Sequence, residues 1–165
     1  MPITLDVRDL LGSVGAARDV RVRERVGGLA TELASVPEDR DVVGSLRLES
    51  LVEGLFATGT LEGSMQLVCA RCLTTMTSPF TVEVRELFAP GATGEDDAYP
   101  VSDGAVDLEP LVRDVVVLAM PFAPLCRPGC LGLCERCGGD RNLNECTCAE
   151  ESDPPWAALE HARTD

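Results

Sequence analysis

The sequence predicts an α+β fold, in which an antiparallel β-sheet packs beside one main helix and a cysteine-rich module follows. Three observations predict it. Several segments alternate apolar and polar residues, one later segment has a broad apolar face at helical spacing, and most cysteines gather near the end of the chain. We expect a core domain over residues 1–125, a cysteine-rich module over 126–150, and an acidic spacer with a short tail over 151–165.

The expected strands lie in the first ninety or so residues. Residues 2–18 suggest a strand followed by a loose stretch. Four later runs alternate apolar with polar side chains, which predicts half-buried strands: 20–26, 46–49, 60–69 and 80–88. We expect the last two runs to form a hairpin whose tip spans 70–78. Its core-facing residues would be Leu61, Met65, Leu67, Phe80, Val82 and Val84.

The main helix is expected to begin after Asp107, its N-cap, and to end near Met120. Pro110 would lie in the first turn, where proline is tolerated, and Pro121 would end the helix. Its apolar face would comprise Leu108, Leu111, Val112, Val115, Leu118 and Ala119. The preceding segment, 89–104, is rich in glycine, proline and acidic residues and predicts an exposed loop.

The eight cysteines form four close pairs, which are Cys69 and Cys72, Cys126 and Cys130, Cys134 and Cys137, and Cys146 and Cys148. Structural zinc takes four ligands in a tetrahedron, commonly as two close pairs, because a short turn can aim two thiolates at one ion. Gly138 directly follows one pair. A glycine there can adopt a positive φ, which brings backbone N–H groups close to the sulfurs.

Four pairs make two sites, so we expect two structural zinc ions. The spacing favours one local site formed by Cys134, Cys137, Cys146 and Cys148. The second site would then join the hairpin tip to the segment after the helix through Cys69, Cys72, Cys126 and Cys130. An alternative grouping is a single site from Cys126, Cys130, Cys134 and Cys137, with the other four cysteines unassigned. Disulfides, a redox pair at the hairpin tip and an iron–sulfur cluster are the competing chemistries.

The charge balance argues for a basic partner. The chain has 28 acidic residues against 14 basic ones, all of them arginine, so its net charge is −14. Such a charge opposes non-specific binding to nucleic acid, which requires a cationic surface. The exception is a stripe formed by Arg21, Arg23 and Arg25 on one face of an expected strand. It could contact RNA phosphate, although a solvated strand face is the simpler interpretation.

Several functional classes find little support. The first residues do not resemble a signal peptide, and the longest apolar run is too short to span a bilayer, so we expect a cytoplasmic protein with no membrane contact. His161 is the single histidine and no phosphate-binding glycine motif is present, so we expect neither an enzyme nor a small-molecule substrate. A tail around Trp156 would dock either on a partner or on the protein's own sheet.

The motifs together resemble the bacterial YceD family in its cysteine-rich form. The resemblance rests on Cys69-Ala-Arg-Cys72-Leu73, on the apolar helix before Pro121, and on Cys126-x3-Cys130-Leu131-Gly132-Leu133-Cys134-x2-Cys137-Gly138 with Asn142-Leu143-Asn144. The tail at 153–159 also fits, with Pro155 where the family has arginine. That family is a domain of unknown function linked to the accumulation, processing or stability of 23S ribosomal RNA.

The resemblance implies a non-enzymatic role in assembly of the large ribosomal subunit. The acidic charge adds the expectation that the protein holds a basic large-subunit ribosomal protein, or a pre-ribosomal particle, more readily than bare RNA. The alternative function is a zinc and thiol redox sensor that releases a partner when its cysteines are oxidised. Retention of zinc under mild peroxide would separate the two, since a sensor should lose its metal readily.

Overall fold

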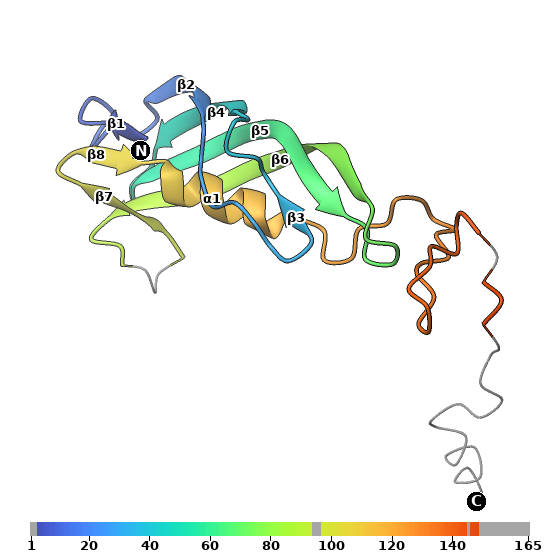
Figure 1. Ribbon diagram of the computed structural model, residues 1–165. Coiled ribbons are helices and arrows are strands. Elements are labelled where there is room, and N and C mark those ends of the chain that lie inside the picture. Colours follow the sequence, from blue (N-terminus) through green and yellow to red (C-terminus); the bar gives the residue numbers. More distant parts are fainter. Residues whose placement is uncertain (1–2, 94–96, 145, 149–165) are drawn as a thin grey trace, which may run out of the picture.

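The computed structural model describes residues 3–93, 97–144 and 146–148 (Figure 1). Within these ranges the chain forms eight strands and one helix. The elements are β1 (Thr4–Asp6), β2 (Ala17–Glu24), β3 (Ala34–Ser35), β4 (Val42–Ser50), β5 (Leu55–Val68), β6 (Thr75–Pro90), β7 (Tyr99–Ser102), β8 (Ala105–Asp107) and α1 (Glu109–Leu118). All strands belong to one sheet in the order β1-β8-β7-β6-β5-β4-β2, with β3 beside β5.

The protein is mostly β, so the predicted α+β class is wrong. Helix α1 has only 10 residues, whereas β5 and β6 have 14 and 16. The predicted loop 89–104 contains β7, and β8 follows it directly, so both strands extend the same sheet. The sheet is also not wholly antiparallel, because β6 and β7 pair in parallel from Phe88 opposite Tyr99 onward. The helix is therefore a single element on a large sheet and not a layer of its own.

The predicted hairpin is confirmed. Strands β5 and β6 pair antiparallel over their length, from Leu55 opposite Phe88 to Val68 opposite Thr75. The turn between them spans 69–74, which is shorter than the expected 70–78. Alternation along both strands directs apolar side chains to the core. Among the predicted core residues, four are buried and Phe80 and Val82 are half-buried against the core; the buried ones are Leu61, Met65, Leu67 and Val84.

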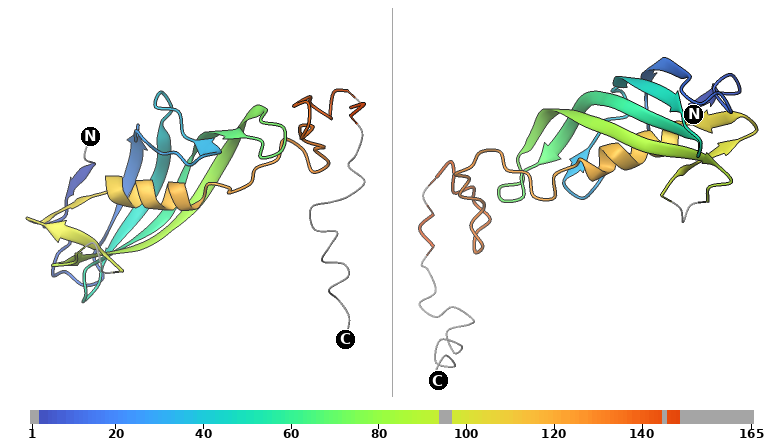
Figure 2. Two further views of the ribbon diagram at one scale, coloured as in Figure 1. Left: turned by 60° about the horizontal axis from the view of Figure 1, so that its bottom comes forward. Right: turned by 180° about the vertical axis from the view of Figure 1, so that it is seen from behind.

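The sheet curls around its own apolar face, and α1 lies across that face (Figure 2). Gly44 in β4 and Gly59 in β5 are half-buried and lie where the two strands pair. A Cβ atom at Gly44 would clash with the carbonyl of Thr60, and one at Gly59 would clash with the carbonyl of Ser45. Glycine removes that obstacle, so the strands can bend and twist strongly.

Helix α1 begins close to the predicted cap. The carboxylate of Asp107 accepts hydrogen bonds from the backbone N–H groups of Glu109 and Ile3, both at 3.0 Å, and thereby ties the helix start to the N-terminal segment. The buried face of the helix consists of Leu111, Val112, Val115 and Val116. Leu118 and Ala119, predicted on that face at its C-terminal end, are instead exposed, and Leu118 is 83% exposed.

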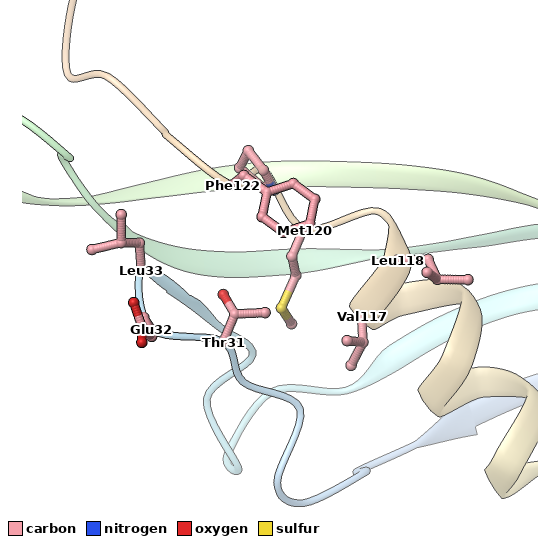
Figure 3. Close-up of a pocket in the computed structure, with 8 residues that line it drawn as sticks. Thr31, Glu32, Leu33, Val117, Leu118, Met120 and Phe122 are labelled. Atoms are coloured by element: carbon pink, nitrogen blue, oxygen red, sulfur yellow. The ribbon is translucent and has the colours of Figure 1, made fainter.

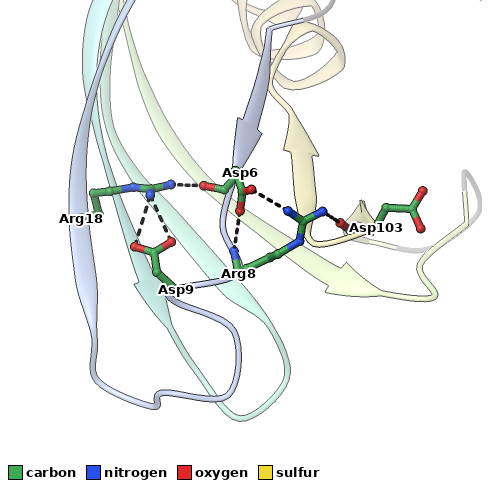
Figure 4. Close-up of polar contacts among 5 residues, drawn as sticks. All are labelled: Asp6, Arg8, Asp9, Arg18 and Asp103. Carbon is green, nitrogen blue, oxygen red and sulfur yellow. Dashed lines mark hydrogen bonds and ion pairs between the residues drawn. The ribbon is translucent and has the colours of Figure 1, made fainter.

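Polar contacts join the loops at the end of the sheet that lies farthest from the cysteines (Figure 4). Arg8 pairs with Asp6 at 2.9 Å and donates to the carbonyl of Asp103 at 2.9 Å. Arg18 pairs with Asp9 at 3.1 Å and also donates to the Asp6 carbonyl. These contacts hold the loop after β1 against β2 and the turn between β7 and β8.

Two further expectations concern membranes and the tail. No helix in the described ranges is long and apolar enough to cross a membrane. The tail with Trp156 and His161 lies outside the described residues, so its docking stays a prediction.

Candidate metal centre

The eight cysteines lie in two groups at the hairpin-tip end of the sheet (Figure 1). The first group takes two cysteines from the turn between β5 and β6 and two from the segment after α1; its members are Cys69, Cys72, Cys126 and Cys130. The second group is local to the C-terminal segment and consists of Cys134, Cys137, Cys146 and Cys148. The structure thus brings together the two sets that the spacing favoured, and not the alternative set that spans both segments.

The distances between sulfurs fit a metal ion. In each group all four sulfurs lie within 4.8 Å of one another. In the first group Cys69 and Cys130 are 3.8 Å apart and Cys72 and Cys126 are 3.6 Å apart. A tetrahedral zinc site with Zn–S bonds of about 2.3 Å has sulfurs about 3.8 Å apart. A disulfide needs about 2.05 Å, and all eight cysteines are free thiols.

The sulfurs of the second group are also close together. Cys137 and Cys146 are 3.6 Å apart, and Cys134 and Cys146 are 3.2 Å apart. The tight Cys146-Thr147-Cys148 spacing does not prevent all four sulfurs from converging. Each group therefore offers four sulfur ligands, which suits zinc and other thiophilic metals.

The two Cys-x-x-Cys turns repeat the same backbone geometry. In the first, the N–H of Leu73 donates to the carbonyl of Cys69 at 3.0 Å. In the second, the N–H of Gly138 donates to the carbonyl of Cys134 at 2.8 Å. Both turns require a positive φ at the residue after the second cysteine, 60° at Leu73 and 69° at Gly138. The predicted positive φ of Gly138 is confirmed, and the repetition identifies Leu73 as its counterpart.

Backbone N–H groups within these turns stabilise one thiolate in each group. Hydrogen bonds from the backbone of Cys72 and then Cys126 lower the pKa of Cys69 to about 6. Hydrogen bonds from the backbone of Cys137 and Arg136 lower the pKa of Cys134 to about 6. A thiolate is the form that binds metal, so the first cysteine of each turn is prepared for coordination.

The remaining thiols illustrate why such a group needs a cation. Burial, followed by the neighbouring thiol of Cys72, raises the pKa of Cys126 to about 12. The neighbouring thiols of Cys146 and Cys137 raise the pKa of Cys148 to about 12. Crowded sulfurs cannot all ionise together without a compensating charge, and a bound divalent cation reverses this penalty.

The two groups differ in burial. Cys69, Cys72 and Cys130 are buried and pack with Met76 and Leu133. The segment after the helix is also tied to the hairpin turn by a backbone hydrogen bond of 2.8 Å from Ala70 to Pro124. The first group therefore staples the sheet to the C-terminal segment. In the second group Cys137 and Cys148 are exposed.

Sequence reasoning did not assign roles to Asn142, which links the two groups, or to Arg71, which joins two parts of the first group. The side chain of Asn142 donates to the sulfur of Cys130 at 3.4 Å and accepts from the N–H of Leu131 at 2.8 Å. Asn142 belongs to the loop of the second group but contacts a ligand of the first. Arg71 donates to the Cys130 carbonyl at 2.9 Å. Asn142 is a polar residue in the short loop between two cysteine pairs, and this position in the sequence could have indicated a hydrogen bond to a cysteine sulfur.

The arginine stripe lies at the edge of the sheet. Arg21 and Arg23 project from the edge strand β2, and Arg25 directly follows it. Asp41 pairs with Arg23 at 3.1 Å and with Arg25 at 3.0 Å, and the hydrogen bond from Arg25 lowers the pKa of Asp41. Within the described ranges Arg21 has no ion-pair partner. The stripe is therefore partly neutralised.

Comparison with known proteins then decides the family. The family described as large ribosomal RNA subunit accumulation protein YceD matches residues 57–161, which include the hairpin, the helix and both cysteine groups. The chain belongs to the YceD family. The suggested resemblance is thereby confirmed.

Relatives of this YceD protein occur in bacteria and plants. An uncharacterized protein of Mycobacterium tuberculosis is 35% identical over 168 residues, covering 96% of this chain and 80% of the relative. The uncharacterized protein YlbN of Bacillus subtilis is 33% identical over 70 residues, 41% of each chain. A maize protein named large ribosomal RNA subunit accumulation protein YCED homolog 1, chloroplastic, is 35% identical over 51 residues, 30% of this chain and 17% of its own. No solved structure matches the chain.

Proposed function

We propose that this protein is a non-enzymatic factor in assembly of the large ribosomal subunit and supports the synthesis, processing or stability of 23S ribosomal RNA. Membership of the YceD family carries this proposal, because the family and its plant members are named for accumulation of large-subunit ribosomal RNA. The protein would act in the cytoplasm, on a pre-ribosomal particle.

The factor acts through a basic ribosomal protein. Its net charge is −14, and two metal ions held by eight thiolates would deepen it to −18, since eight negative and four positive charges are added. Newly made ribosomal proteins are cationic chains that an acidic surface attracts over long range. Holding such a protein until it meets its RNA would link this acidic molecule to RNA accumulation without a strong RNA contact.

The two cysteine groups hold structural zinc in this proposal. All eight cysteines are ligands, and the C-terminal module over 126–150 is built around the ions. The supporting observations are the sulfur distances and the repeated Cys-x-x-Cys turns. Four sulfur ligands leave no open position, so the ions stabilise the fold and do no catalysis. Elemental analysis of the purified protein should find about two zinc ions per chain; iron with visible absorbance would contradict the assignment.

A deletion strain tests the function. Loss of the gene should lower the ratio of 23S to 16S ribosomal RNA and cause large-subunit precursors to accumulate in sucrose gradients. Wild-type protein should restore both, and a variant that lacks the four cysteines of the first group should not. Unchanged ribosomal RNA ratios and gradients in the deletion strain would refute the proposal.

The exposed thiols of the second group favour one rival function, a redox sensor. A sensor should lose zinc at low peroxide concentration and release its partner at the same time. A structural module should retain zinc under that treatment. Measuring zinc release with a chromophoric chelator against peroxide concentration separates the two functions.

A further inference from the structure

An apolar hollow lies where α1 ends and the chain turns towards the cysteines (Figure 3). It has a volume of about 380 Å³. One wall is the segment before β3, with Leu33, and the other is the helix end. Figure 3 shows the side chain of Met120 at the centre, with Leu33 on one side and Leu118 on the other.

Two large apolar side chains at the hollow are left in water. Phe122 is 99% exposed and Leu118 is 83% exposed. Leu118 is the last residue of α1, and Phe122 directly follows Pro121, which cannot continue a helix. A group of exposed apolar side chains beside a hollow is typical of an interaction surface, because single exposed residues are common but clusters are not.

The hollow is also electronegative at its rim. Glu32 lines it and provides a carboxylate. The C-terminus of α1 lies there too, and the last turn of the helix contains no basic residue. Because the carbonyl end of a helix carries partial negative charge, an uncompensated C-terminus attracts a cation. The surface therefore combines an apolar floor with a site for lysine or arginine.

We propose that this hollow is the docking site for a basic extended segment of a protein, which inserts one apolar side chain between Leu118 and Phe122 and places a neighbouring lysine or arginine against Glu32. The inference rests on the proposed function, for which it names the contact surface. Few polar groups converge on the hollow, whereas small-molecule sites usually offer several placed ones. Charge complementarity selects a cationic peptide over RNA, whose phosphates the Glu32 carboxylate repels.

The position of the hollow connects it to the first cysteine group. Phe122 is four residues before Cys126, and the intervening Pro124 accepts the backbone hydrogen bond from Ala70 in the hairpin turn. The metal site thereby fixes the segment that carries Phe122. A preformed surface loses less conformational entropy on binding. The first cysteine group would therefore increase the affinity for the partner without contacting it.

The test uses the full chain loaded with zinc and each purified large-subunit ribosomal protein as probe, with binding followed by fluorescence anisotropy. The double variant Leu118→Ser, Phe122→Ser should bind the partner at least about tenfold more weakly, as is usual for anchor residues. Glu32→Lys should slow association, most clearly at low salt. Val52→Ser is the matched control, since Val52 is 88% exposed in the turn between β4 and β5.

The outcomes separate the two proposals. A ribosomal protein that binds the wild type and the double variant equally would overturn the hollow as the docking site and leave the proposed partner class standing. Binding of none of these proteins, with tight binding of naked 23S RNA, would overturn both. Sedimentation that shows a wild-type dimer, dissociated by the double variant, would make the hollow a contact between copies and overturn the proposal.

Discussion

Leu73 occupies the one position in the two Cys-x-x-Cys turns where glycine is physically preferred but absent. Its φ is 60°, close to the 69° of Gly138 in the equivalent position. A side chain in this conformation costs roughly 1–2 kcal/mol. Glycine would relieve that strain, although its freedom in the unfolded chain offsets about 0.5–1 kcal/mol.

We predict that Leu73→Gly stabilises the zinc-loaded protein by about 0.5–1 kcal/mol. Leu73 is 58% exposed, so little packing is lost with its side chain. The free energy of unfolding in urea measures the change. Gly138→Leu is the reciprocal variant and should destabilise the second turn. Destabilisation by Leu73→Gly would mean that the Leu73 side chain has a contact role that outweighs the strain.

Asn142 gives a second prediction at this scale. Its amide donates to the Cys130 sulfur, and such partners of metal ligands typically change metal affinity by about 10–100-fold when removed. Asn142→Ala should therefore accelerate zinc loss from the first group, although Asn142 lies in the loop of the second. Each cysteine group should give its own kinetic phase of zinc release to a chelator, and both phases should be faster in Asn142→Ala than in the wild type. Asn144→Ala is the control, and an unaltered slow phase in Asn142→Ala would contradict a link between the groups.

At the scale of elements, short-range pattern predicted well and long-range strand pairing did not. The β5–β6 hairpin, the helix near 107–120 and the four close cysteine pairs all follow from spacing within one segment. Strand β7 was missed because its Gly- and Pro-rich surroundings suggest a loop. Its strand partners lie close in the chain, since Tyr99 pairs with Phe88 and Val101 with Val106. The long-range pairing is that of β1 with β8, about one hundred residues later.

The predicted fold class was wrong because periodicity identifies a helix but does not show how much of the sheet that helix covers. Here the sheet covers much of its own inner face by curling, with help from the segment after β2 that buries Val26, Leu29 and Val36. At Gly44 and Gly59 a Cβ atom would clash with the paired strand, and this requirement is visible only when that strand is in place.

We expect the proposed C-terminal module over 126–150 and the sheet to unfold separately. Cys137→Ser removes one ligand of the second group, and metal binding supplies most of the folding free energy of such small units, about 10–16 kcal/mol in zinc-finger peptides. We predict loss of amide-exchange protection over 131–148 and retained protection in β4, β5 and β6. The sheet has its own core, so it does not need the second metal.

Hydrogen exchange with mass spectrometry makes this measurement. Cys72→Ser is the matched variant, since it removes a ligand of the first group and should loosen the hairpin turn that carries it. Protection lost throughout the sheet in Cys137→Ser would show that the module is not a separate unit and that the boundary near 126 is misplaced.

For the whole molecule, the distribution of charge decides which partner is favoured. Most arginines of the sheet domain are paired with carboxylates, as in Arg47 with Asp19 at 3.4 Å and Arg85 with Glu83 at 3.1 Å. Each exposed pair stabilises the fold by only about 0–1 kcal/mol. Their larger effect is to neutralise the positive charge locally, so that the excess of acidic residues determines the field around the protein.

We therefore predict measurable binding to a basic large-subunit ribosomal protein, with an association rate that falls as salt rises, and weak binding to naked 23S RNA. Attraction between opposite charges is screened by salt over a Debye length of about 8 Å at physiological ionic strength. Arg21, Arg23 and Arg25 are the feature that could reverse this prediction. Two of them already share Asp41, so only Arg21 offers a charge without a carboxylate partner in the described ranges.

The decisive comparison uses the wild type and a triple Arg→Ala variant at positions 21, 23 and 25, each measured against both ligands at two salt concentrations. The variant makes the surface more acidic, so it should bind the basic protein as well as the wild type or slightly faster, and RNA binding should stay weak. A variant with Asp41→Asn frees Arg23 and Arg25 and serves as the opposite control. Tight RNA binding by the wild type, lost in the triple variant and strengthened in Asp41→Asn, would show that the local arginine face outweighs the net charge and that RNA is the direct ligand.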